Sequence, residues 1–141
     1  MSKAAVVYWS GTGNTQAMAE LVAAGVTEAG AEVAVMTSAE FHAAMMDEYD
    51  AIAFGCPSMG AEQLEEEEFE PMFEECRSKL SGKKIALFGS YGWGDGEWMR
   101  SGEEQCAADG AVLVCDFVIC CEAPDDATAA ACAAMGKALV S

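Results

Sequence analysis

The loop at residues 10–15 has the sequence SGTGNT, which combines two glycines with four hydroxyl or amide side chains. Glycines allow a tight turn whose backbone N–H groups point into one concavity, and a following helix adds a partial positive charge. The loop holds no lysine or arginine and matches neither GxxxxGK[ST] nor GxGxxG, so nucleoside triphosphate chemistry is not expected. These residues predict a permanently bound phosphate monoester held by neutral donors, with an ordinary hydroxyl-rich helix cap as the alternative.

Two further segments combine glycine with hydroxyl and aromatic residues. GCPSMGAEQL covers residues 55–64, and SYGWGDGEW covers residues 90–98. Trp93 stands between glycines, where an indole is free to lie flat on a planar ring system. Trp98 is predicted only to open a helix, and the single histidine, His42, is predicted to lie on the surface.

Predicted strands and helices alternate along the whole chain. The strands are expected at residues 4–9, 32–36, 51–55, 84–89 and 111–120. The helices are expected at residues 18–29, 39–46, 69–80, 98–109 and 126–140. This order predicts a single α/β domain over residues 1–141, with a doubly wound five-stranded parallel sheet. Ligands of such sheets bind beyond the carboxyl ends of the strands, so the loops after strands one, three and four should converge on one site.

The composition limits the partners that the protein can have. Lys plus Arg is 7 and Asp plus Glu is 24, a formal charge of −17, which repels nucleic acid and anionic membranes and attracts basic proteins. Solubility alone is the other explanation of this acidity. The seven cysteines include no CxxC pair and are predicted to be reduced and mostly buried. No signal peptide and no run of transmembrane length are found, so we expect a soluble, cytoplasmic protein.

Three segments of the chain resemble the flavin-binding loops of flavodoxins. YWSGTGNT at residues 8–15 resembles their phosphate loop. GCPSMG at residues 55–60, followed by EQLEEEEFEP, and LFGSYGWGDGEWM at residues 87–99 resemble the two loops that hold the flavin ring. The fifth strand shows no interruption, which resembles the short-chain subgroup. The resemblance implies a flavodoxin-like fold with strand order 2-1-3-4-5, FMN bound without a covalent bond, and the shuttling of single electrons.

The resemblance also implies roles for individual residues. The phosphate of FMN would be held by Ser10, Gly11, Thr12, Gly13, Asn14 and Thr15. Met59 would cover one face of the flavin ring and Trp93 would stack on the other. Gly60 and Ala61 would face flavin N5, and Glu62 would accept a hydrogen bond from flavin N3–H. Ala61 stands where the family often has Asp, Asn or Gly. The remaining cofactor-binding residues, along the ribityl chain and the pyrimidine edge, would be Pro57, Ser58, Ser90, Tyr91 and Gly92.

These features predict a low-potential one-electron carrier, not an enzyme, that acts as a monomer between basic-surfaced redox proteins and binds neither nucleic acid nor membrane. The glutamate run at residues 65–68 is expected to disfavour an anionic reduced flavin and to dock basic partners, and a solvated helix cap is its alternative. An FMN-dependent reductase of a small-molecule substrate is the first alternative function. A receiver-type signalling module is the second, and it would need an acidic pair where this chain has Tyr8-Trp9-Ser10.

Overall fold

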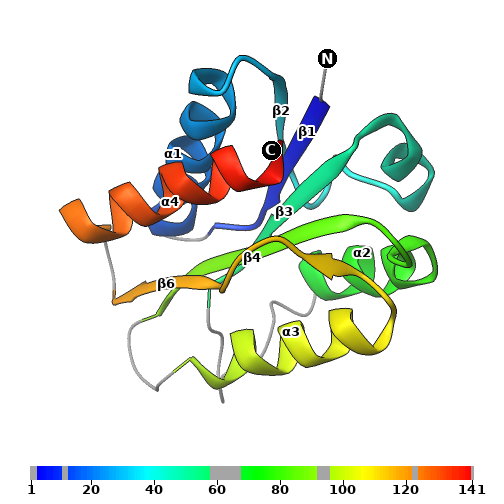
Figure 1. Cartoon of the computed structure of the whole chain (residues 1–141). Coiled ribbons are helices and arrows are strands. Elements are labelled where there is room, and N and C mark those ends of the chain that lie inside the picture. The colour runs from blue at the N-terminus through cyan, green and yellow to red at the C-terminus, as the bar shows by residue number, and fades with distance from the viewer. Residues whose placement is uncertain (1–2, 11–12, 58–67, 92–95, 122–123, 141) are drawn as a thin grey trace.

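The computed structural model describes residues 3–10, 13–57, 68–91, 96–121 and 124–140 (Figure 1). The strands are β1 (Lys3–Tyr8), β2 (Glu32–Thr37), β3 (Ala51–Gly55), β4 (Lys84–Tyr91), β5 (Val112–Leu113) and β6 (Val118–Cys121). The helices are α1 (Asn14–Glu28), α2 (Phe69–Cys76), α3 (Glu97–Ala108) and α4 (Asp126–Leu139). Two 3₁₀ segments complete the described elements, η1 (Ala43–Glu48) and η2 (Arg77–Lys79).

All these strands pair in parallel in one sheet. Their order is β2-β1-β3-β4-β5, and β6 also pairs with β4, so the predicted order 2-1-3-4-5 is confirmed. In the centre of the sheet, Val6 of β1 lies between Val35 of β2 and Ala53 of β3. Because every strand is parallel, the carboxyl ends of β1, β3 and β4 meet at one edge of the sheet (Figure 1).

The prediction of an uninterrupted fifth strand over residues 111–120 is wrong. On β4 only residues 86 and 87 separate the partners of β5 from those of β6, whereas residues 114–117 intervene on the fifth strand. The two extra residues form a bulge. The Phe117 N–H at this bulge donates to Glu103 Oε2 of α3 at 3.0 Å. Burial raises the pKa of Glu103, and this hydrogen bond opposes the rise.

Other predicted boundaries need smaller corrections. The helix expected at residues 39–46 is wrong over its first half, since the only helical turn there is η1, which begins at Ala43. The fourth strand does not end at Gly89 but continues through Ser90 to Tyr91 because β6 pairs with both residues. The helix expected at residues 69–80 ends at Cys76 and continues as the 3₁₀ turn η2.

The two faces of the sheet carry side chains of different size. Toward α1 and α4 the three central strands present mostly small residues, among them Ala4, Ala51, Ala53 and Ala86. Toward α2 and α3 they present larger ones, among them Val7, Ile52, Phe54, Ile85 and Leu87. On this second face the ring of Phe54 meets the ring of Phe73 edge-on, with centroids 5.2 Å apart. Since alanine has only a Cβ, the first pair of helices can pack close to the sheet.

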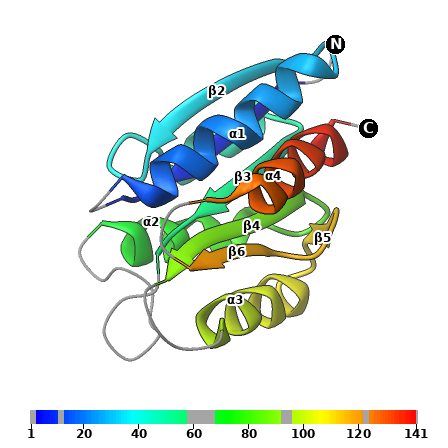
Figure 2. The same ribbon diagram turned by 90° about the vertical axis from the view of Figure 1, so that its left-hand side faces the viewer.

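Helices α1 and α4 lie side by side on the small-residue face (Figure 2). Two glycines form their contact. A Cβ atom placed on Gly136 of α4 would collide with the Val22 carbonyl oxygen and lie 2.7 Å from the Val26 nitrogen. A Cβ atom on Gly25 of α1 would collide with the Ala133 carbonyl oxygen of α4. The obstacles are backbone atoms, which cannot rotate away, so the helix spacing requires glycine at both positions.

Gly136→Ala should therefore lower the free energy of unfolding by about 2–4 kcal/mol, because the helices must separate to admit a methyl group. Urea unfolding of the FMN-free protein measures this change. The matched control is Gly102→Ala in α3, where the new Cβ would meet only the Leu87 Cδ1 atom at 3.3 Å. That side chain can shift, and alanine favours a helix by about 1 kcal/mol over glycine, so the control should change stability little. Equal losses in the two variants would contradict the proposed backbone contact.

Candidate functional site

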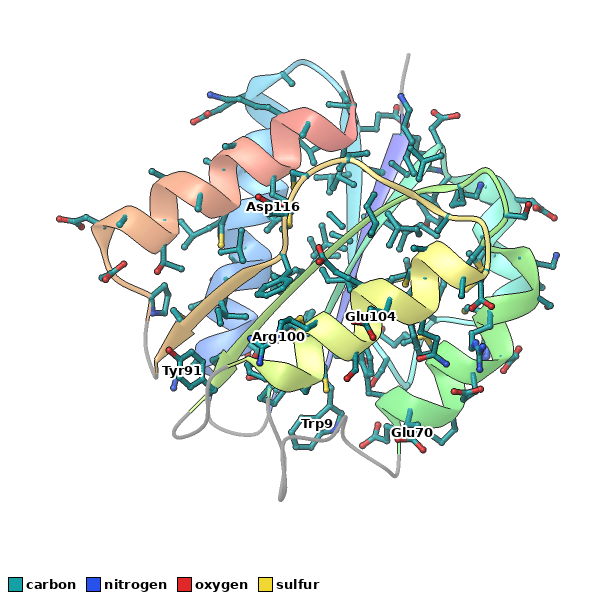
Figure 3. The ribbon with its side chains drawn as sticks, turned by 60° about the horizontal axis from the view of Figure 1, so that its bottom comes forward. Trp9, Glu70, Tyr91, Arg100, Glu104 and Asp116 are labelled. Carbon is teal, nitrogen blue, oxygen red and sulfur yellow. The ribbon has the colours of Figure 1, made fainter. Side chains whose placement is uncertain are left out.

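The carboxyl edge of the sheet brings together residues that directly follow β1 and β3. The Trp9 N–H donates to the Gly55 carbonyl at 3.0 Å, and the Cys56 N–H donates to the Phe88 carbonyl at 3.1 Å. These bonds extend the sheet by one residue beyond β1 and β3. Figure 3 shows Trp9 and Tyr91 at this end of the molecule, together with Glu70. The predicted loops after β1, β3 and β4 therefore all begin at one edge of the sheet, as expected from the alternation of strands and helices.

The first loop leads into the N-terminus of α1. Gly13 has φ 96°, a left-handed conformation that favours glycine, and its N–H donates to Ser10 Oγ at 3.0 Å. No side chain caps the helix at Gly13, and the first turn contains no acidic residue. The first intrahelical bond at this end runs from the Ala17 N–H to the Gly13 carbonyl. Within the described residues, no side chain is bound to the first-turn N–H groups from Asn14 onward, which favours an anion over an ordinary side-chain helix cap as their partner.

A buried pair of hydroxyl groups lies behind this helix N-terminus. Thr15 Oγ1 of α1 and Ser90 Oγ of β4 are 2.8 Å apart, and their residues are 1% and 4% exposed. The resemblance placed Ser90 in a loop, but the residue belongs to β4. Each hydroxyl has one proton and two acceptor positions, so the pair can also serve a third polar group. Neutral hydroxyl and N–H donors at a helix N-terminus fit a phosphate monoester, such as that of FMN, without any cationic side chain.

A second hydrogen bond joins the ends of β3 and α3. The Trp98 indole N–H donates to the Cys56 carbonyl at 3.0 Å, and the ring of Trp98 meets that of Tyr91 edge-on. Sequence reasoning gave Trp98 a weaker claim to the site than Trp93 and favoured a place at the start of a helix, where it does lie. The glycine at position 89, within a strand, was the one local signal of a close backbone approach here.

The other predicted site residues divide into two groups. Asn14, Pro57 and Tyr91 are described and half-buried. The following lie outside the described residues: Gly11, Thr12, Ser58, Met59, Gly60, Ala61, Glu62, Gly92 and Trp93. Three of the four glutamates of the acidic run, residues 65–67, lie outside them as well, whereas Glu68 is described and exposed.

Three of the described cysteines are poorly suited to act as nucleophiles near neutral pH. Burial raises the pKa of the thiols of Cys76, Cys106 and Cys132 to about 12. Five of the six cysteines whose side chains are described are buried, as predicted, and Cys115 is half-buried. His42 is exposed, also as predicted. Within the described part of the chain, no three His, Cys, Asp or Glu side chains are grouped so that they could hold a metal ion.

Within the part of the chain that the structure describes, no helix is long and apolar enough to cross a membrane.

Comparison with known proteins identifies relatives of the whole chain. The flavodoxin family model matches residues 6–135. The flavodoxin of Clostridium beijerinckii is 50% identical over 122 residues, which are 86% of this chain and 88% of that protein. The flavodoxin of Megasphaera elsdenii is 43% identical over 133 residues, 94% of this chain and 95% of that protein.

Solved structures give the same answer. The solution structure of two-electron reduced Megasphaera elsdenii flavodoxin superimposes with a TM-score of 0.89 at 43% identity, covering 96% of this chain and 97% of that one. A flavodoxin from the domain Archaea superimposes with a TM-score of 0.84 at 28% identity, covering 97% and 95%. The fold, the neutral phosphate loop and these relatives agree: the chain belongs to the flavodoxin family and is a short-chain, FMN-binding electron carrier.

Proposed function

We propose that the protein is a low-potential carrier that holds FMN by neutral donors at the N-terminus of α1 and passes electrons one at a time between redox proteins. One observation supports the assignment of the phosphate site: the N-terminus of α1, which has no side-chain cap among the described residues, stands beside the buried Thr15–Ser90 hydroxyl pair. Bound FMN supplies the redox chemistry, because the flavin ring accepts and releases single electrons. The chain positions the cofactor and sets its electrostatic surroundings.

The remaining cofactor contacts in this proposal follow the family resemblance. The phosphate is held by Ser10, Gly11, Thr12, Gly13, Asn14 and Thr15, and the flavin and ribityl chain by Pro57, Ser58, Met59, Gly60, Ala61, Glu62, Ser90, Tyr91, Gly92 and Trp93. The described members of the set support it by position, since Ser10, Pro57 and Tyr91 each lie at or just beyond the carboxyl end of a sheet strand. Ser10 additionally shapes the turn by accepting from the Gly13 N–H.

We further propose that the protein acts without a substrate of its own, as a cytoplasmic monomer whose single domain spans residues 1–141. The described strands all join one sheet, which supports a single domain. The formal charge of −17 favours partners with a basic surface. Exposed glutamates support docking at the cofactor end, because Glu68 and Glu70 stand at the start of α2, and Figure 3 places Glu70 at the same end as Trp9.

Two measurements on the purified FMN-loaded protein test this function. Stepwise anaerobic reduction, followed by absorption, should show two separate one-electron steps, the second at a much lower potential than the first. Steady-state assays with NADH or NADPH should show negligible turnover. A protein that oxidised a nicotinamide cofactor at enzymatic rates without any partner would be a reductase instead.

Thr15→Val tests the phosphate site, since valine keeps the branched shape of threonine and removes its hydroxyl group. FMN affinity should fall by about 1–3 kcal/mol because polar partners lose a hydrogen bond. Affinity for riboflavin, which lacks the phosphate, should be much weaker from the start and nearly unchanged by the substitution. Flavin fluorescence quenching measures both constants.

The control for this prediction is Thr27→Val near the other end of the same helix. Thr27 Oγ1 donates only to the Ala23 carbonyl, far from the loop, so FMN affinity should stay the same. If Thr15→Val weakened riboflavin and FMN binding equally, the hydroxyl would not belong to the phosphate site.

Ionic strength should control electron transfer to a basic redox protein. Salt screens attraction between oppositely charged surfaces, so the second-order rate constant should fall by about tenfold or more between 10 mM and 300 mM salt. Stopped-flow oxidation of the fully reduced protein by a basic cytochrome measures the rate. An acidic cytochrome serves as the control, and its rate should rise with salt. Rates that do not depend on salt would contradict docking through the acidic surface.

A further inference from the structure

We propose that Trp98 is a positioning residue for the flavin. Its indole ring contacts both of the strand ends that lead into the proposed ring-binding segments. Those strand ends are Cys56, directly after β3, and Tyr91, the last residue of β4. This inference rests on the proposed cofactor contacts, in which the segments beginning at residues 57 and 92 bind the flavin ring.

The first contact is a buried hydrogen bond between residues 42 positions apart in the sequence. The Trp98 N–H donates to the Cys56 carbonyl at 3.0 Å, with Trp98 3% exposed and Cys56 fully buried. The Cys56 N–H is bound on its other side by the Phe88 carbonyl of β4. Pro57 follows and has no N–H to donate, so regular strand pairing cannot continue there. The indole therefore holds the last backbone carbonyl before the chain leaves the sheet.

Gly89 of β4 makes room for this arrangement. A Cβ atom at position 89 would collide with the Cys56 carbonyl oxygen and lie 3.2 Å from Cζ2 of the Trp98 ring. Because glycine has no Cβ, the Cys56 carbonyl can pack against Gly89 of β4, with the Trp98 ring next to both. The hydrogen bond between Trp98 and Cys56 therefore lies where the end of β3, β4 and α3 come together.

The second contact reaches the other strand end. The rings of Tyr91 and Trp98 meet edge-on, with centroids 5.8 Å apart and planes inclined by 61°. Trp98 is also the second residue of α3, whose buried N-cap residue, Gly96, ends the segment that starts after Tyr91. The Trp98 side chain consequently contacts both strand ends, Cys56 after β3 and Tyr91 of β4.

A protein binds a planar ring more tightly when the segments on the two faces of the ring are already in place, since ordering them on binding costs affinity. A fixed Cys56 carbonyl and a fixed Tyr91 ring supply that order from within the protein. The phosphate loop is held separately by its own bonds, Gly13 N–H to Ser10 Oγ and the Thr15–Ser90 pair. Loss of the indole bond should therefore weaken binding of the ring and leave binding of the phosphate intact.

Trp98→Phe tests this separation because it keeps a buried aromatic ring and removes the donor. Three quantities are measured: the dissociation constant of FMN by flavin fluorescence, that of inorganic phosphate for the FMN-free protein by calorimetry, and the visible circular dichroism of FMN at saturation. The FMN constant should rise by about tenfold, as expected for the loss of one buried hydrogen bond. The phosphate constant should stay within about twofold of the wild-type value, and the dichroism of bound FMN should change because the ring is held differently.

Gly89→Ala should disrupt the same hydrogen bond at its acceptor, because the new methyl group displaces the Cys56 carbonyl. It should reproduce the pattern of Trp98→Phe, and the double variant should lose less affinity than the product of the two single losses. Leu139→Ala is the control for general destabilisation. Leu139 is 1% exposed and packs on the opposite face of the sheet, so this variant should unfold at lower urea and keep all three binding signals.

Hydrogen exchange of the Trp98 indole N–H in the FMN-free protein gives a readout without the cofactor. It should be slow in the wild type and faster in Gly89→Ala. The proposal is overturned if Trp98→Phe, compared at equal concentrations of folded protein, leaves the FMN dissociation constant and the dichroism unchanged. It is also overturned if Trp98→Phe weakens phosphate binding as much as FMN binding. It is also overturned if the Trp98→Phe protein does not fold and Gly89→Ala leaves FMN binding unchanged. Failure of the wild-type protein to bind FMN would instead refute the proposed function.

Discussion

At the carboxyl edge of a parallel sheet, the outgoing chains can no longer pair with one another, yet their buried backbone groups still require hydrogen-bond partners. Much of this structure meets that requirement. At that edge the Trp98 indole N–H donates to the Cys56 carbonyl. Within the sheet, where the bulge interrupts the fifth strand, the Glu103 carboxylate accepts from the Phe117 N–H. Among the described residues, no side chain caps the first-turn N–H groups of α1. In the proposed function the phosphate of FMN is their partner, so cofactor binding would satisfy the same constraint as the fold.

The difference in side-chain size between the two faces of the sheet affects where the N-terminus of α1 lies. Alanines of β3 and β4, such as Ala53 and Ala86, let α1 approach the centre of the sheet. The glycine contact with α4 holds α1 close beside that helix on the same face. Thr15, in the first turn of α1, reaches Ser90 near the end of β4. Helix packing on this face thus joins the loop after β1 to the strand β4.

Local sequence was sufficient for the main elements and for the chemistry of the first loop. Continuous apolar runs predicted the central strands, because strands covered on both faces need apolar side chains at every position. Glycine at position 30 predicted the end of α1, and it has φ 84° there. Hydroxyl and glycine residues without any lysine predicted a neutral anion site, and this stays a prediction. In the structure Ser10 Oγ accepts from the Gly13 N–H, and Thr15 pairs with Ser90. The strand order was predicted from the resemblance to flavodoxins, whose three loops occur in the same order along this chain.

What the sequence by itself determined is therefore the set of elements, their order and the donor chemistry of the phosphate loop. Tertiary structure alone decided the contacts between them: Thr15 with Ser90 across 75 positions, and Trp98 with Cys56 across 42. It also decided that β4 continues to Tyr91 and that the fifth strand bulges at residues 114–117, since both depend on what the neighbouring strand can pair. Propensity and periodicity depend on neighbours along the chain, whereas a hydrogen bond between distant residues depends on how closely their elements pack, and no local pattern records that distance.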